Sequence, residues 1–210
     1  MKALKGTGLA AACLAATLAA GCGEVARSGR SPVQIVVVSM EGASGAAADT
    51  FSGTVRSDVV TMVQRQVGGE SVQVSTTFDD PGRVTMRLVL KDQGVPGSVA
   101  SPSLLNAVTV NRYRVRYLRS DGRNVEGTDV PYAFDSASTF TIPPDGDVTA
   151  GFTLVRHTSK YEAPLASLAN SSVIISTIAE VTFYGHDQTG NEVIATANIG
   201  IFFGNFGDPQ

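Results

Sequence analysis

"AEVTFYGHDQTGNEVIATANIGIFF", residues 179–203, is the stretch that decides the fold. On both sides of its centre, apolar residues alternate with polar or small ones. This period of two matches a β-strand with one face on a core and the other toward water. The centre, residues 187–191, is typical of a turn, because Gly190 can adopt a positive φ and the Asp187 side chain can cap the loop backbone. The stretch therefore predicts two long strands joined by a tight turn.

The same period of two recurs along most of the chain. It predicts further strands at residues 33–39, 51–55, 59–63, 72–78, 84–90, 108–118, 148–155 and 174–184. Clusters of Asp, Asn, Pro and Gly between them are typical of turns, at residues 79–82, 121–124 and 143–146. One short helix is expected, around residues 161–169. Many short strands separated by such turns predict an all-β protein with an antiparallel β-sandwich.

Residues 179–203 resemble the last hairpin of bacterial immunoglobulin-like and fibronectin-III-like domains, which often carry Asp, two residues and then Gly-Asn between their final strands. The resemblance implies an immunoglobulin-like core over about residues 84–205, and it brings no catalytic residues. Such a sandwich needs about 100 residues. We therefore expect extra N-terminal strands in one sandwich domain over residues 33–210, with residues 42–48 as a flexible loop. The alternative is a separate small β-element at residues 33–78.

The first 21 residues have the three parts of a secretory signal peptide. Lys2 and Lys5 precede a short apolar run, and small residues end it. The run is shorter than the roughly 20 apolar residues that span a bilayer. We therefore expect residues 1–21 to be removed on export.

The end of this signal, Leu18-Ala19-Ala20-Gly21-Cys22, resembles a bacterial lipobox. The resemblance implies cleavage before Cys22 and a diacylglycerol on its sulfur. Gly23 after the cysteine implies the outer membrane, on its periplasmic face or at the cell surface. The polar residues 22–32 predict a flexible tether. The alternative is an ordinary signal peptide followed by a chance cysteine.

Composition limits the partners of the mature chain. Loss of Lys2 and Lys5 leaves 14 basic residues against 19 acidic ones, a net charge near −5. This balance argues against nucleic acid as a partner. With Cys13 removed and Cys22 acylated, no disulfide or cysteine metal site is expected, and no cofactor.

Residues 111–119 read NRYRVRYLR and place three arginines on one face of a strand, in steps of about 6.6 Å. These are Arg112, Arg114 and Arg116. Such a stripe could bind phosphate or acidic glycans. The alternative is a solvated outer face whose arginines pair with acids on a neighbouring strand.

Asp187, Asn191 and Glu192 form a candidate calcium site at one end of the sandwich. Their carboxylate and amide oxygens are the ligands that Ca²⁺ prefers, although the spacing is not that of an EF-hand. The alternative is that they only shape the turn.

No group of residues predicts a catalytic site. His157 and His186 are the only histidines, and no GxSxG motif is present. The acidic residues at 79–80 and at 145–147 could serve glycoside hydrolysis, but both sets lie in sequences typical of turns. We therefore expect a non-catalytic module anchored to the membrane, which binds an envelope protein or a glycan. The alternative is a small envelope hydrolase or a calcium-dependent glycan-binding protein with a site in the loops.

Overall fold

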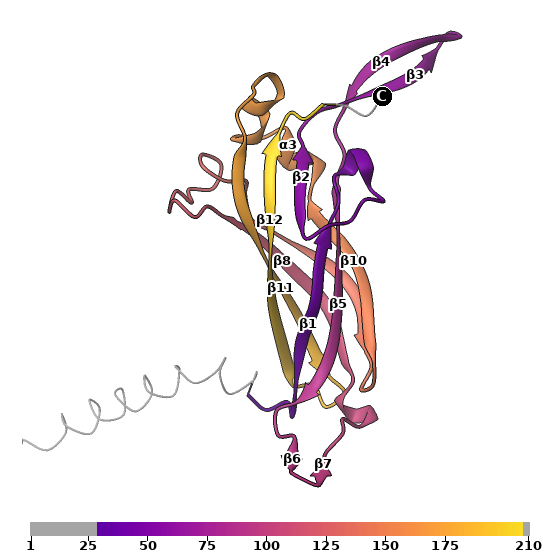
Figure 1. Ribbon diagram of the computed structural model, residues 1–210, viewed down its shortest axis with the longest axis vertical. Coiled ribbons are helices and arrows are strands. Elements are labelled where there is room, and N and C mark those ends of the chain that lie inside the picture. The colour runs from indigo at the N-terminus through magenta and orange to yellow at the C-terminus, as the bar shows by residue number, and fades with distance from the viewer. Residues whose placement is uncertain (1–28, 208–210) are drawn as a thin grey trace, which may run out of the picture.

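Alternating apolar side chains build two β-sheets, which pack face to face in the computed structural model of residues 29–207 (Figure 1). The three-stranded antiparallel sheet has the order β1 (Val33–Gly42), β5 (Asp80–Leu90), β10 (Asp147–Val155). The five-stranded sheet has the order β2 (Thr54–Asp58), β12 (Glu192–Gly204), β11 (Ile175–Asp187), β8 (Val108–Leu118), β9 (Phe134–Ile142). All pairs in it are antiparallel except β2 with β12. The predicted all-β antiparallel sandwich is confirmed.

The remaining elements are short and lie outside both sheets. Two hairpins are formed by β3 (Thr61–Val67) with β4 (Glu70–Thr76) and by β6 (Gly94–Val95) with β7 (Ser98–Val99). The helical turns are η2 (Gly45–Ala47), η3 (Leu104–Asn106), α3 (His157–Lys160) and η4 (Leu165–Asn170). Within residues 29–207, no helix has the length and apolar character needed to cross a membrane.

Two tyrosines of β8 join the sheets across the core. Tyr113 and Tyr117 are buried, on the face of β8 opposite the three arginines. The Tyr113 hydroxyl donates to the Thr153 carbonyl at 3.1 Å and accepts from its N–H at 3.0 Å. Tyr117 donates to the Leu154 carbonyl at 2.8 Å. Because Thr153 and Leu154 belong to β10, these bonds satisfy the buried hydroxyls and link the five-stranded sheet to the three-stranded one.

The N-terminal strands are divided between the two sheets. β1 pairs with β5, and β2 pairs with the last five residues of β12. The expectation that they extend the sandwich is therefore confirmed for these two strands. Residues 61–76 instead form the separate β3–β4 hairpin.

Two of the differences from the sequence prediction concern β9 and the start of β5. β9 was not predicted, because Ser136 and Ser138 share its partly buried face with Phe134 and Phe140 and interrupt the apolar alternation. The turn predicted at residues 79–82 is wrong for all but its first residue, since β5 already begins at Asp80.

Two predictions for local segments also need correction. The helix expected at residues 161–169 is instead two short pieces, α3 and η4, on either side of residues 161–164. Residues 42–48, expected to be a flexible loop, contain η2 and the buried Ala43.

The two ends of the sandwich carry different features (Figure 1). At the end that we call proximal, β1 begins and the Lys91 N–H donates to the Pro32 carbonyl at 2.9 Å. Hairpin β6–β7, η3 and the β11–β12 turn also lie there. β2, α3 and hairpin β3–β4 lie at the opposite, distal end. Ser31 is buried, so the last residues of the predicted tether contact the sandwich. The signal peptide, Cys22 and residues 22–28 of the tether lie outside the described residues.

Candidate functional site

The arginine stripe lies on the outer face of β8, as the sequence predicted, and each arginine has an acidic partner. Arg112 and Arg114 lie 3.1 and 2.8 Å from the two carboxylate oxygens of Asp135 on β9. Arg116 lies 2.9 Å from Glu180 on β11. These partners follow from strand register, because Arg114 is directly opposite Asp135 and Arg116 directly opposite Glu180.

This pairing leaves three cations facing two acids. The Arg112 guanidinium also lies 3.9 Å from the centre of the Tyr184 ring. All three arginine side chains are about half exposed, and exposed pairs of this kind contribute about 0–1 kcal/mol. The geometry is that of a solvated face with cross-strand ion pairs. A polyanion would have to compete with Asp135 and Glu180 for the same guanidinium groups.

Asp187 caps the β11–β12 turn with its carboxylate. One oxygen accepts from the N–H groups of Thr189 and Asn191, both at 2.9 Å, and from the Thr189 hydroxyl at 2.7 Å. The other accepts from the Asn191 amide at 3.0 Å. Burial raises the pKa of Asp187, but these hydrogen bonds outweigh it and hold the pKa well below its usual range. Glu192 lies in β12 beside His186.

Asp187 and Asn191, two of the three residues of the candidate calcium site, are thus hydrogen-bonded to each other through their side chains. Within residues 29–207, no group of three or more His, Cys, Asp or Glu side chains is arranged to hold a metal ion.

The two histidines lie at opposite ends of the sandwich. His157 begins α3 at the distal end, where its Nδ1 lies 2.8 Å from the carboxylate of Asp79. His186 lies within β11, opposite Thr109 and Glu192. The carboxylates at 79–80 and 145–147 are likewise separated by the length of β10. The structure therefore does not bring these groups into one site.

A buried polar cluster at the distal end was not predicted from the sequence. It consists of Ser57, Asp58, Asp80 and Lys160, and we call it the root cluster. One Asp80 oxygen accepts from Lys160 Nζ at 2.8 Å and from the Gly45 N–H at 2.7 Å, and the other accepts from the Ser57 hydroxyl at 2.5 Å. Burial raises the pKa of Asp80, against the opposite effects of Lys160, Ser57 and the Gly45 N–H.

The root cluster fixes the point where hairpin β3–β4 leaves the sandwich. Lys160 Nζ donates a second bond to the Asp58 carbonyl at 2.8 Å. The Asp58 carboxylate accepts from the Thr61 hydroxyl and from the Phe206 N–H, both at 3.2 Å. Asp58 ends β2 and Thr61 begins β3, so the cluster holds both sides of this junction. Ser57, Asp80 and Lys160 are all buried, which makes them a structural support rather than a nucleophile open to solvent.

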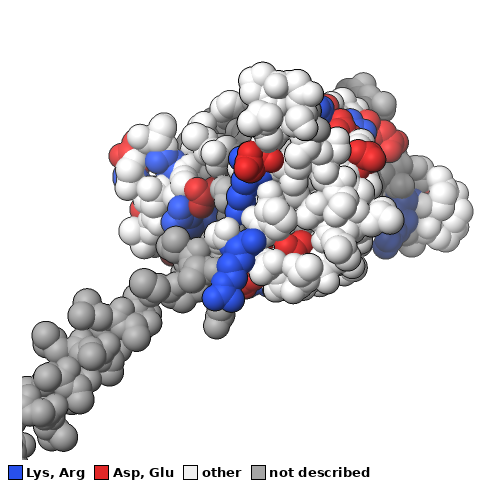
Figure 2. Space-filling view, turned by 90° about the horizontal axis from the view of Figure 1, so that it is seen from below, with Lys and Arg blue, Asp and Glu red and all other residues white. Residues whose placement is uncertain are grey.

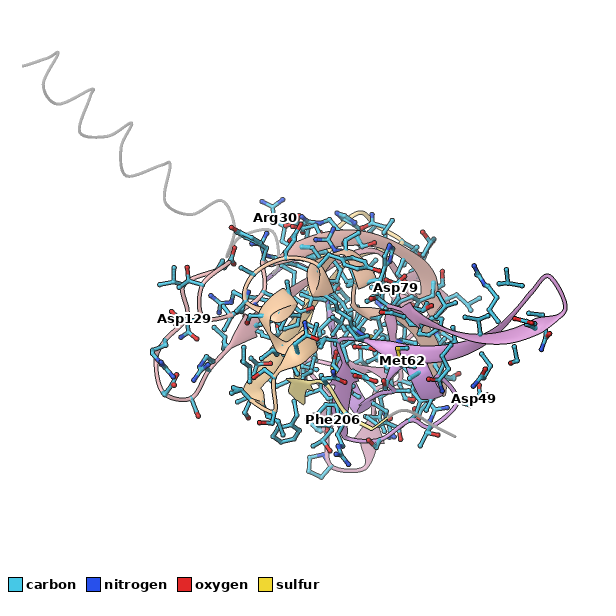
Figure 3. The ribbon with its side chains drawn as sticks, turned by 90° about the horizontal axis from the view of Figure 1, so that it is seen from above. Arg30, Asp49, Met62, Asp79, Asp129 and Phe206 are labelled. Atoms are coloured by element: carbon cyan, nitrogen blue, oxygen red, sulfur yellow. The ribbon has the colours of Figure 1, made fainter. Side chains whose placement is uncertain are left out.

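Hairpin β3–β4, which we call the arm, projects away from the sandwich with Met62 at its base (Figures 1 and 3). Its strands pair from Thr61 opposite Thr76 to Val67 opposite Glu70. The connection, Gly68-Gly69, has positive φ at both residues. This is the geometry of a two-residue type I′ turn, for which Gly-Gly is well suited.

The arm has one valine-rich face and one polar face. Strand register places Arg65 and Glu70 with four valines on one side. These are Val63, Val67, Val72 and Val74. The opposite side carries Gln64, Gln66, Ser71 and Gln73. Toward the tip the valines are uncovered, and Val67 is 56% exposed.

A local sequence pattern could have predicted the arm, whereas no local pattern could have predicted the root cluster. Gly-Gly between two alternating segments is a recognised hairpin pattern, yet only residues 59–63 and 72–78 were predicted as strands. The root cluster joins Ser57, Asp58, Asp80 and Lys160, and no local pattern links Asp80 to a lysine 80 positions away.

Comparisons with family models, with curated proteins and with solved structures found no match to this chain.

The root cluster leads to a prediction about stability. Lys160→Met should leave the buried Asp80 carboxylate without its cation, which should lower the free energy of unfolding by about 3–5 kcal/mol. Arg87→Met is the matched control, since it breaks the exposed pair of Arg87 with Asp147 and should cost less than about 1 kcal/mol. Urea unfolding followed by circular dichroism measures both. Equal losses in the two variants would contradict the role assigned to the cluster.

Proposed function

We propose that this protein is a non-catalytic cell-envelope lipoprotein, held on a bacterial outer membrane by an acylated Cys22, and that its arm docks to a partner protein. The observation that carries the proposal is the arm itself: an ordered hairpin with an exposed valine face, supported at its base by a buried ion pair.

The arm has the properties of a docking element rather than of a self-sufficient structure. A two-stranded hairpin is marginally stable in water unless something covers its apolar face. The arm has no strand partner on either outer edge among residues 29–207, so both edges can accept a strand from another protein. We infer a protein partner with an exposed sheet edge, which would pair with the arm and cover Val67 and Val72.

The placement of the arm suits a membrane-anchored protein. The described chain starts at the proximal end, and the arm leaves from the distal end (Figure 1). With an anchor at Cys22, the sandwich would separate the arm from the lipid surface and make it available to partners in the envelope.

The anchor is tested by exchanging each cysteine in turn in the full chain. Cys22→Ala should move the protein from the membrane fraction to the soluble fraction, because the acylated sulfur is lost. Cys13→Ala should leave it in the membrane fraction, since Cys13 lies in the removed signal. Fractionation and immunoblotting provide the readout. Membrane association that persists in Cys22→Ala would refute the lipid anchor.

The arm is tested by cross-linking in intact cells, followed by capture of the tagged full chain. Val67→Asp with Val72→Asp should reduce the recovered partner at least about tenfold, because two valines that each contribute about 1.5–3 kcal/mol when buried would be lost. Gln66→Asp with Ser71→Asp adds the same charges to the polar face and should retain the partner.

Two results would overturn the docking role of the arm. One is recovery of the same partner in equal amount from both double variants. The other is absence of any recurrent protein partner from the wild-type chain.

A further inference from the structure

The proximal end carries a neutral apolar tip that the proposed function does not use. Residues 93–107, between β5 and β8, contain no Lys, Arg, Asp or Glu. They include three strongly exposed apolar side chains: Val95 at 68%, Leu104 at 82% and Leu105 at 64%. Figure 2 views this end and shows charged side chains scattered among broader uncharged areas. Two adjacent leucines held in water lose the stabilisation that burial would provide.

The two leucines are held outward by a closed local structure. Ser103 and Asn106 form a capping box around η3, in which the Asn106 side chain accepts from the Ser103 N–H at 2.7 Å and from its hydroxyl at 3.1 Å. The Asn106 N–H donates to the Ser103 carbonyl at 2.8 Å. These bonds satisfy polar groups of the turn internally, which is what an apolar medium requires of a backbone.

The tip lies at the end from which the chain leads back to Cys22. The Pro32 carbonyl accepts a hydrogen bond from the N–H of Lys91, which lies two residues before the uncharged residues 93–107 begin. The buried Ser31 helps to lower the pKa of Asp187, the last residue of β11, so it also lies at this end. Only residues 22–28 separate Cys22 from the described chain, and seven residues span at most about 25 Å. A lipid on Cys22 would therefore keep the proximal end close to the bilayer.

We infer that the tip formed by Val95, Leu104 and Leu105 inserts into the lipid interface and holds the sandwich upright on the membrane. This inference rests on the proposed lipid anchor and deepens it. The occupant is a lipid surface, since the tip is uncharged, several polar groups of its η3 turn are hydrogen-bonded within the turn, and the anchor sets its distance from the bilayer. Apolar groups of this kind lie about 5–10 Å deep, at the boundary of headgroups and acyl chains.

The inference is tested with the full lipidated chain in vesicles of phosphatidylethanolamine and phosphatidylglycerol. Leu105→Cys is labelled with an environment-sensitive fluorophore, and nitroxide-bearing lipids serve as quenchers. The matched control is Val67→Cys at the tip of the arm, which is also an exposed apolar position. The Leu105 probe should shift to the blue and lose severalfold more emission to the quencher than the Val67 probe.

Flotation of the unlabelled chain with the vesicles separates the two claims. A chain that floats while its Leu105 probe remains unquenched would overturn the inserted tip and leave the anchor intact. A chain that does not float and whose Cys22 reacts with a thiol reagent would overturn the anchor and the tip together. A second variant, Leu104→Ser with Leu105→Ser, should still float but should bring a probe at position 67 closer to the lipid, because the sandwich would no longer be held upright. An unchanged position 67 signal in that variant would count against the inference.

Discussion

The ion pair between Lys160 and Asp80 is the interaction on which the distal end of the molecule depends. Both groups are buried, and a buried charge is tolerated only when it is paired and hydrogen-bonded. The partners that satisfy this requirement come from η2, β2, β5 and α3, which are far apart in the chain. The hydrogen bonds that the Asp80 carboxylate and the Lys160 ammonium group require therefore fix how these four elements meet. The arm leaves the sandwich at this meeting point, so the same bonds hold its base.

The sequence was most informative where one face of a strand is uniformly apolar. The β11–β12 hairpin and the inner face of β8 were predicted because apolar residues recur there at every second position over most of each strand, although a bulge between Val110 and Arg112 shifts the alternation within β8. β9 was missed because Ser136 and Ser138 occupy inward-facing positions. The start of β5 was missed because Asp-Asp-Pro-Gly is typical of a turn, and the strand there is maintained by Lys160, which comes from a distant segment.

For the candidate sites too, the sequence did not predict contacts between residues that are far apart in the chain. The alternation in residues 111–119 predicted which face of β8 carries the arginines, but their acidic partners follow from strand register, which single-strand patterns do not contain. In the sequence, Asp187 fits both a calcium ligand and a turn cap, and in the structure its oxygens accept hydrogen bonds from Thr189 and Asn191. The arm had a local signal, Gly68-Gly69 between alternating segments. The docking role that we propose for it rests instead on the exposure of its valines, which only the folded chain defines.

The central claim is that the sandwich separates a lipid-anchored proximal end from a docking arm at the distal end. The most direct test is the thickness of the protein layer that the full lipidated chain forms on a supported bilayer, measured by neutron reflectometry. β11 and β12 have 13 residues each and are about 43 Å long, so an upright sandwich should give a layer at least that thick, with the arm beyond it. A layer clearly thinner than the length of these strands would show the sandwich lying flat and would contradict the account.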